Sequence, residues 1–467
     1  MDDRRKKYRV WDAVQGRREA VCPQEVLPPN DLVFFLLDTV PQMDLSAFHS
    51  YYADELRGQP PFDVSMMVTL LVYSYAVGVF SSRKIAAACE RNLAFRAVVA
   101  DDRPDFRTIS DFRKHHLEAF RPLFIEVLRV AGELGMVHLG NLSTDGTKIG
   151  ANASRHKAMS YGYMQKEIQR LEQEIEQLLN QAEQTDSEQD AALGSRRGDE
   201  LPDELARREV RLKRIQEARA RLDAEAQARA AEEQRLRDEA QTQREAEGKS
   251  RRGKPPAPVD PTPANKAQTN FTDPEAKMMK QSNKGFDYSY NSQAVVDGAH
   301  QLIVAAEVTC AANDKQQALP LAQAALANLT AAGVERPVDS EQRPLPIPNT
   351  ADNGYFSEAA VDALEKLGFD PHIATGRQKH HATESPSAET PNTSVKERMA
   401  HKLRTELGKQ LYAARKAIVE PVFGQIKHIR GFRKFSLRGI VKVAAEWQLI
   451  CLTHNLLKIW RFAFSGP

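Results

Sequence analysis

Two aspartate-glycine pairs, far apart in the sequence, constrain the fold most strongly, because the patterns around them differ. Residues 286–309, FDYSYNSQAVVDGAHQLIVAAEVT, contain two alternating apolar and polar runs on either side of Asp297-Gly298. This pattern is typical of two antiparallel strands joined by a tight turn. Asp145-Gly146, in contrast, has a predicted strand only before it, at 138–145. We therefore expect a strand that ends at Asp145.

The chain that follows the hairpin alternates helical and strand patterns. A helical pattern covers 314–333, a short strand ends at Asp352, and a helix begins at about Ser357. The segment DPHIATG, 370–376, is expected to form another short strand, and the chain from about 394 to 463 is expected to be helical. Strands that alternate with helices in this way predict an α/β fold with a mixed sheet.

A long polar block separates the first strand from the hairpin. Between 164 and 248 the chain is rich in Glu, Gln, Arg and Ala, and its few large apolar residues have helical spacing. These residues are Ile168, Leu171, Ile175, Leu178, Leu205, Leu212, Ile215 and Leu222. The spacing predicts an antiparallel helical hairpin or a short coiled coil. Residues 248–266 have the composition of a disordered linker, so the whole block 164–270 is interpreted as an insertion.

The first 135 residues are predicted to be helical. The longest apolar run, 66–80, contains Thr, Ser and two Tyr, which favours a buried helix over a membrane span. Ser81 or Ser82 can cap a second helix after a short join, an arrangement compatible with a helix-turn-helix. Further along, Thr108 and Asp111 have the spacing of a capping box.

Charge and cysteine content narrow the class of protein. The 467 residues include 41% hydrophobic and 27% charged residues and have a net charge of +2, which is typical of a soluble globular protein. Residues 401–467, however, carry 13 Lys or Arg against three Glu, an excess that could hold a polyanion. The four cysteines are far apart, which argues against a zinc site and a disulfide framework and fits a reducing cytoplasm. The basic start, MDDRRKKYR, has no apolar stretch after it, so no signal peptide is expected.

Three acids stand out as candidate metal ligands. Asp145 and Asp352 each follow a predicted strand, a position that places side chains at one edge of a sheet, although both also suit an ordinary turn. Together with Glu420 they would supply the oxygen ligands that divalent cations prefer. Two such ions about 3.5–4 Å apart can promote the displacement of a phosphodiester. Asp314 and Asp287 are rival acids, interpreted as a helix N-cap and a strand-face residue.

Several segments in this order carry a family resemblance. The segments are STDGTKIGANAS, TDPEAKMM, YSYNSQAVVD, ADNGYFS and YAARKAIVEPVFGQIKHIRGFRKFSLRG. Together they resemble the DDE transposases of bacterial insertion sequences, and PFDVSMMVTLLVYSYAVGVFSSRKIAAACERN resembles the helical N-terminal domain of those proteins. The resemblance covers about 45–163 and 271–460.

The resemblance implies an RNase H-like catalytic core with an all-helical N-terminal domain. The implied domains are 1–135 for DNA binding, 136–163 together with 271–463 for catalysis, and 164–270 as the inserted helical hairpin. The implied catalytic metal ligands are Asp145, Asp352 and Glu420, which would hold two Mg²⁺ or Mn²⁺ ions.

The last block of the resemblance carries a Tyr-Arg-Glu-Lys signature. Tyr412, Arg415 and Lys427 match the residues around Glu420, but four residues separate Arg415 from Glu420 where the commonest form has three. On an ideal helix these two side chains would be about 140° apart, so Lys416 could take the role of Arg415. Pro421 disfavours a regular helix just before it, and the helix is expected to start or kink there.

Basic residues near the signature and at the start of the second helix are expected to contact DNA phosphates, unless they form an ordinary solvated face. They are Lys427, Arg430, Arg433, Lys434, Arg438, Arg83 and Lys84. Phe432 and Phe435 are interleaved with them, whereas Trp447 is expected in the core.

The resemblance implies a transposase that cleaves and joins the DNA ends of an insertion sequence. Its partners would be the terminal inverted repeats and target DNA, it would pair two ends as a homodimer, and it would act in the bacterial cytoplasm at the nucleoid, without a membrane. A catalytically inactive DNA-binding relative and a Mg²⁺-dependent nuclease without joining activity are the alternatives.

Overall fold

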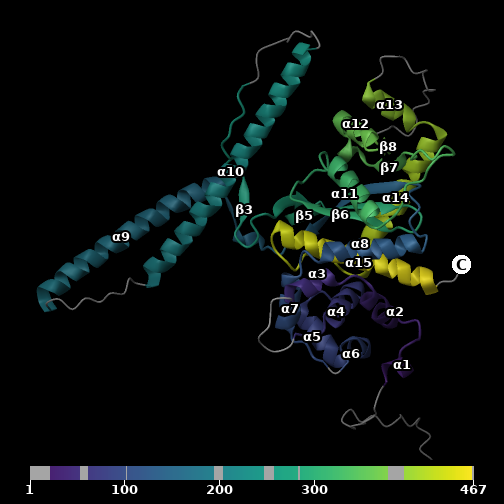
Figure 1. The fold of residues 1–467 in the computed structure, drawn as a ribbon. Coiled ribbons are helices and arrows are strands. Elements are labelled where there is room, and N and C mark those ends of the chain that lie inside the picture. Colours follow the sequence, from purple (N-terminus) through teal and green to yellow (C-terminus); the bar gives the residue numbers. More distant parts are fainter. Residues whose placement is uncertain are drawn as a thin grey trace, which may run out of the picture.

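The computed structural model describes residues 22–52, 61–100, 102–193, 203–246, 257–281, 284–376 and 394–464. These ranges form a mixed sheet covered by helices, a helical N-terminal region and a long two-helix arm that projects from the body (Figure 1). The basic start of the chain and part of the predicted linker at 248–266 lie outside the described residues.

The main sheet has the strand order β4-β5-β1-β7-β8, and β6 pairs with β5. Its strands are β1 (Leu142–Gly150), β4 (Lys277–Lys280), β5 (Phe286–Asp297), β6 (Ile303–Thr309), β7 (Ile347–Ala351) and β8 (Phe369–Ile373). β5 is antiparallel to β1, β4 and β6, whereas β1, β7 and β8 are parallel. This mixed sheet with flanking helices confirms the predicted RNase H-like α/β class.

The hairpin predicted at 286–309 is confirmed by β5 and β6, but the strand that contains Asp145 differs from the prediction. β1 pairs with β5 along its whole length, from Leu142 opposite Asp297 to Gly150 opposite Ser289. The backbone groups after Asp145 therefore have partners in β5, and the strand continues through Gly146 to Gly150. The prediction that the strand ends at Asp145 is wrong.

The N-terminal region is helical, as predicted. Its helices are α1 (Pro23–Val26), α2 (Leu32–Thr39), α3 (Ser46–His49), α4 (Val64–Ala76), α5 (Ser82–Arg91), α6 (Leu93–Val99), α7 (Phe106–His115) and α8 (Phe120–Glu133), with short 3-10 turns at Val40–Gln42 and Ser50–Tyr52. The Asn92 side chain caps α6 and divides the predicted second helix in two. Asp105 caps α7 through the backbone N–H groups of Arg107 and Thr108, so the predicted capping box at Thr108 is wrong.

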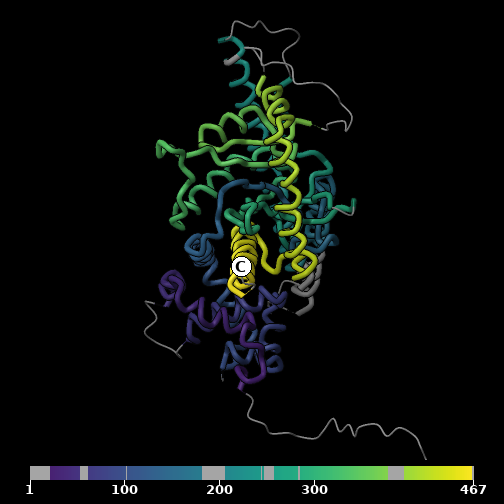
Figure 2. The backbone as a smooth tube through the Cα atoms, turned by 90° about the vertical axis from the view of Figure 1, so that its right-hand side faces the viewer, coloured from purple at the N-terminus to yellow at the C-terminus, as the bar shows by residue number. Residues whose placement is uncertain are grey.

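One C-terminal helix joins the N-terminal region to the sheet. α15 (Ile440–Phe464) lies with α8 between the N-terminal helices and the strands in both views (Figures 1 and 2). Trp447 of α15 is fully buried and donates its Nε1–H to the Gln293 carbonyl of β5 at 3.0 Å. The Asn455 side chain bonds both backbone groups of Ile303 at 2.8 Å. The two parts therefore share one core, and the core position predicted for Trp447 is confirmed.

The remaining helices flank the strands that carry the candidate acids. They are α11 (Ala318–Ala331), α12 (Glu358–Lys366), α13 (Val395–Lys402) and α14 (Glu406–Gly424), with a 3-10 turn at Asn353–Tyr355 and a π-helical turn at Gln425–Ile429. α14 runs through Pro421, so the helix does not start there. The other predicted possibility, a kink at Pro421, stays a prediction. Residues 430–439 are not helical and form a loop before α15.

The inserted block forms the arm. β2 (Ala158–Ser160) pairs with β3 (Gln268–Asn270) at its base, and α9 (Tyr161–Leu193) and α10 (Asp203–Ala246) form the arm itself. Tyr161 donates to Asp223 at 2.7 Å, and Arg208 lies 3.0 Å from Glu174. The start of α9 therefore pairs with the later part of α10, which confirms the predicted antiparallel helical hairpin.

None of the helices in the described ranges is long and apolar enough to cross a membrane. All four cysteines are free thiols.

Candidate active site

The strand register places Asp145 and Asp352 side by side. β1 and β7 are parallel neighbours, with Leu142 opposite Asn349 and Thr144 opposite Ala351. Asp145 and Asp352 are the next residues of the two strands, at the point where β7 ends. In a parallel pair, residues at matching positions share a face of the sheet, so both carboxylates lie at one corner of the sheet.

Asp145 is a largely buried carboxylate, with 22% of its side chain exposed. One of its oxygens accepts a hydrogen bond from the Gly146 N–H at 2.8 Å, and the other lies 3.4 Å from Nη1 of Arg415. Burial raises the pKa of Asp145 to about 6, and the negative charges of Asp352 and Asp314 add to the effect, against the opposing contributions of Gly146 and Arg415. The corner therefore gathers three carboxylates, those of Asp145, Asp352 and Asp314, with Arg415 beside the first.

Asp352 also supports the turn that follows it. Its Oδ1 accepts a hydrogen bond from the Gly354 N–H at 2.7 Å and begins the 3-10 turn Asn353–Tyr355. A Cβ atom at Gly354 would lie 2.9 Å from this oxygen and 3.6 Å from Oδ2 of Asp314. The absence of a side chain at Gly354 therefore leaves room between the two carboxylates.

α14 brings Arg415 to the site. The Arg415 side chain is 9% exposed, and its guanidinium lies beside Asp145 and 5.8 Å from the centre of the Tyr412 ring. Lys416 is exposed on the same helix. Of the two cations weighed from the sequence, Arg415 is thus the one in contact with Asp145.

Lys427 ties the end of the same helical segment to β1. Its ammonium group donates to Thr147 Oγ1 at 2.9 Å and to the Lys148 carbonyl at 3.2 Å. Thr147 lies two residues after Asp145 and so on the same face of the strand. The π-helical turn Gln425–Ile429 contains Lys427.

Glu420 lies on α14 between Arg415 and Lys427, and it is exposed. Its carboxylate has no hydrogen-bond or ion-pair partner among the described residues. The described residues also contain no group of three or more His, Cys, Asp or Glu side chains arranged to hold a metal ion. Two other glutamates of the C-terminal helices are no closer to a metal-ligand role, because Glu406 is exposed in the first turn of α14, and Glu446 is buried and hydrogen-bonded to Tyr75, Ser436 and Leu437.

Asp314 was interpreted as a helix cap but lies at the site. The residue at the N-cap of α11 is Gln317. The Asp314 carboxylate accepts hydrogen bonds from Asn291 and Gln293 at 2.7 Å each and lies 3.7 Å from the Lys148 ammonium. The sequence signal for this position is Asn291 and Gln293, two amide side chains two residues apart in the buried strand β5, because buried amides need polar partners.

The remaining rival acid, Asp287, lies on β5 and pairs with Arg155 at 3.0 Å. This position confirms its interpretation as a strand-face residue.

The basic residues around the loop 430–439 divide into two groups. Arg433, Lys434 and Arg438 are exposed. Arg430 is buried and donates to the Ile450 carbonyl and to Thr453 Oγ1 in α15, and burial lowers its pKa to about 10. This placement argues against the predicted phosphate contact by Arg430.

Two further predicted DNA contacts are exposed in the first turn of α5. Arg83 and Lys84 both reach solvent, and the Arg83 guanidinium lies 4.9 Å above the Phe106 ring. The aromatic residues of the basic loop, Phe432 and Phe435, are buried and therefore belong to the core.

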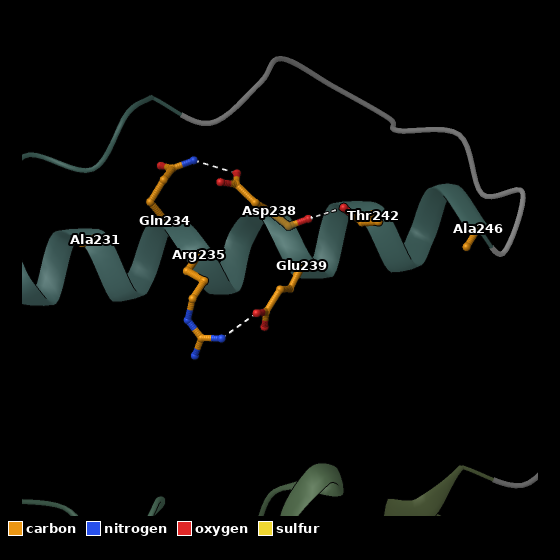
Figure 3. Close-up of a pocket in the computed structure, with 7 residues that line it drawn as sticks. All are labelled: Ala231, Gln234, Arg235, Asp238, Glu239, Thr242 and Ala246. Carbon is orange, nitrogen blue, oxygen red and sulfur yellow. Dashed lines mark hydrogen bonds and ion pairs between the residues drawn. The ribbon is translucent and has the colours of Figure 1, made fainter.

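A hollow on the arm contributes nothing to this site. Figure 3 shows that it is lined by one face of α10 alone, where neighbouring side chains pair with one another, as Arg235 does with Glu239 at 2.6 Å. None of the candidate acids lines it.

Two family models match the chain at either side of this site. The model described as Transposase domain (DUF772) matches residues 21–115, and the model described as Transposase DDE domain matches residues 376–460. The first range contains α1 to α7, and the second contains α14, Glu420 and most of α15. No curated protein and no solved structure matches the chain.

The two matches support a DDE transposase of an insertion sequence, with a transposase domain in the N-terminal part of the chain and a Transposase DDE domain in the C-terminal part. Transposase DDE domains generally use divalent metals. Asp145 and Asp352 offer hard oxygen ligands, the kind that such ions prefer.

Proposed function

We propose that this transposase cleaves the DNA ends of its insertion sequence and joins them to target DNA. Two Mg²⁺ or Mn²⁺ ions would be held by Asp145, Asp352 and Glu420. The observation that carries the proposal is the register of β1 and β7, which sets Asp145, within β1, beside Asp352, the residue after the end of β7. Bound cations would activate the attacking oxygen and stabilise the leaving oxygen.

Glu420 is the proposed third ligand because of its neighbours on the helix. Arg415 before it and Lys427 after it both contact β1, on the face that carries Asp145 and Thr147. The exposed carboxylate lies on the segment between these two contacts, without a competing partner among the described side chains. Arg415 favours the ionised form of Asp145, and Lys427 holds the strand beside it.

The proposed reaction has two steps, and neither needs a protein nucleophile. Water attacks the phosphodiester at the end of the element and frees a 3′-hydroxyl, which then attacks the target strand. Arg433, Lys434 and Arg438 would hold the phosphates beside the site, and residues 1–135 would bind the terminal repeats through Arg83 and Lys84. Pairing of two ends implies a homodimer on DNA.

The decisive experiment incubates the protein with DNA that carries the element ends and with Mg²⁺, and maps both cut and joined strands. Cut ends joined to target DNA support the proposal. Cutting without joining identifies a simple nuclease, and binding without cutting identifies an inactive relative. A chelator control should abolish both products.

A further inference from the structure

A buried carboxylate that the proposed chemistry does not use lies in the middle of α15. Glu446 is 1% exposed, and both of its oxygens are occupied. One accepts a hydrogen bond from the Tyr75 hydroxyl at 3.0 Å. The other accepts from the backbone N–H groups of Ser436 and Leu437, at 2.9 and 3.0 Å. Glu446 therefore connects α4 of the N-terminal region to the basic loop 430–439.

The chain of hydrogen bonds continues from Tyr75 to the start of α5. Buried Arg113 donates from Nη1 to the Tyr75 hydroxyl at 2.7 Å and to the Phe80 carbonyl at 3.1 Å. Its other terminal nitrogen lies 3.4 Å from Ser82 Oγ. Ser82 is the first residue of α5 and directly precedes Arg83.

The opposite end of the chain holds the loop that carries the exposed cations. Leu437 directly precedes Arg438, whose Nε donates to the Asn152 carbonyl at 2.9 Å. The Asn152 side chain donates in turn to the Ser436 carbonyl at 2.7 Å. The loop is thus fixed both to the chain just after β1 and to Glu446.

Direct packing accompanies the hydrogen bonds. The Phe80 and Phe432 rings meet edge to face with centroids 5.0 Å apart. A Cβ atom at Gly78 would lie 2.6 Å from the Arg430 carbonyl oxygen, and Gly78 has a positive φ of 81°, so only glycine fits this approach without strain. The segment before α5 and the loop 430–439 are therefore in close contact.

A buried chain of this kind is not explained by stability alone. Apolar residues of similar volume are often as stabilising as a buried ionic pair, whereas removal of one partner leaves the other uncompensated. Tyr75 is the single group between the cation and the anion, because its hydroxyl accepts from Arg113 and donates to Glu446. Burial raises the pKa of Tyr75, so the hydroxyl keeps the proton that it donates.

We propose that Arg113, Tyr75 and Glu446 are positioning residues that couple DNA contact by α5 to DNA contact by the loop 430–439. The N-terminal helices and the catalytic domain would then present one preset surface to a duplex end. The inference rests on the proposed DNA contacts of Arg83, which follows Ser82 at one end of the chain of hydrogen bonds, and of Arg433, which lies in the same loop as Ser436 and Leu437 at the other end.

The test is a double-mutant cycle for binding of an element-end duplex, without divalent metal and at fixed salt. Arg83→Ala, Arg433→Ala and the double variant are compared with the unmodified protein. If the contacts are coupled, the loss of affinity in the double variant should differ from the product of the two single losses by about 5-fold or more. When Tyr75→Phe is added to all four proteins, the loss of affinity in the double variant should equal the product of the two single losses within about 2-fold.

Tyr73→Phe is the matched control. Tyr73 lies on the same helix, is buried and packs edge-on against Phe95, but it takes no part in the chain to Glu446. Coupling should survive this change. Glu446→Gln is a second disruption, because an amide cannot replace both carboxylate oxygens as acceptors, and it should remove coupling as Tyr75→Phe does.

The outcomes separate the two levels of the proposal. Additive losses in the unmodified background, or coupling that persists in both Tyr75→Phe and Glu446→Gln, would overturn the inference while leaving DNA binding intact. Failure of the unmodified protein to bind element-end DNA would instead overturn the proposed function.

Discussion

The corner of the sheet around Asp145 and the helical arm both gather acidic side chains, but the fold neutralises them differently. In the arm, Glu167 is 4% exposed and pairs with Arg170 at 2.7 Å and Arg211 at 2.8 Å. The hydrogen bond from Arg170 holds the pKa of Glu167 below its ordinary value. At the corner, burial and like charges raise the pKa of Asp145 instead.

This difference distinguishes the role of Glu167, which stabilises the arm, from the role proposed for Asp145, which is to bind a metal ion. The carboxylate of Glu167 has its counter-charges within the arm, so it needs nothing from outside the chain. Asp145 has one cation beside it, Arg415 at 3.4 Å, and two negative neighbours, and its burial makes the ionised form unfavourable. A bound cation would stabilise that ionised form. Perturbed carboxylates of this kind are concentrated at functional sites.

The largest expected effect is on catalysis at the corner. Asp145→Asn should lower the rate of end cleavage by about 10³-fold or more, because it removes a proposed metal ligand, while end binding stays largely intact. Strand mapping with Mg²⁺ and binding without it measure the two effects. Glu232→Gln in the arm, where Glu232 pairs with Arg235 at 2.7 Å, is the control and should cleave normally.

Loss of the circular dichroism spectrum in Asp145→Asn would show that the aspartate supports the strand and not the chemistry. A variant that folds and still cleaves would remove Asp145 from the site.

A smaller effect is expected on DNA binding by the exposed cations of the loop. Arg433→Ala and Lys434→Ala should each weaken binding to all DNA sequences and reduce the slope of log affinity against log salt by about one per lost phosphate contact. Arg235→Ala in the arm, an equally exposed cation, should leave the slope unchanged. Equal slopes in all three variants would show that the loop faces solvent only.

Part of this arrangement could be predicted because its signals are local. The hairpin at Asp297-Gly298 and the turn after Asp352 depend on residues that are adjacent in sequence, and both were found. α12 begins directly after Ser357, close to the predicted start, and the Ser357 side chain caps it by accepting from the Ala360 N–H.

Other features depend on partners far along the chain. The second half of β1 has a weak strand pattern, and it forms because β5, more than a hundred residues later, pairs with it. The position of Asp314 depends on Asn291 and Gln293 across the sheet. Arg415 reaches Asp145 through the packing of α14, which an ideal helical wheel could not supply.

The charge at the corner also predicts a measurable effect on stability. The folded state binds the Asp145 proton up to about pH 6, above the ordinary value of 3.8. The contribution of Asp145 to the free energy of unfolding is therefore fully present below about pH 4. It is lost as the pH rises to 6, because over this range the carboxyl ionises in the unfolded chain but stays protonated in the folded one. A shift of two pKa units represents roughly 3 kcal/mol of unfavourable ionisation in the folded state. With a chelator at pH 7, Asp145→Asn removes this cost but also removes the partner of Arg415. The free energy of unfolding should therefore rise by only about 1–2 kcal/mol.

Urea unfolding at pH 4 and pH 7 measures this effect. The gain should appear at pH 7 and vanish at pH 4. An equal gain at both values would mean that packing and not charge separates the two proteins.

The smallest expected effect on the body of the protein comes from removal of the arm. The apolar residues of α9 and α10, including Ile168, Leu171 and Ile215, pack in a cluster of their own, apart from the main core. β2 and β3 close the base of the arm by pairing Ala158 with Asn270.

Deletion of about 165–265 with a short linker should therefore leave a folded core, with a thermal midpoint close to that of the full chain. The variant loses the ion pair of Lys277 with Glu225 at 2.7 Å, but partly exposed pairs contribute only about 0–1 kcal/mol. Calorimetry and near-ultraviolet circular dichroism measure the outcome. An aggregated core would show that the arm covers apolar surface of the body. The arm would then not be satisfied by contacts within itself, and the contrast with the corner around Asp145 would no longer hold.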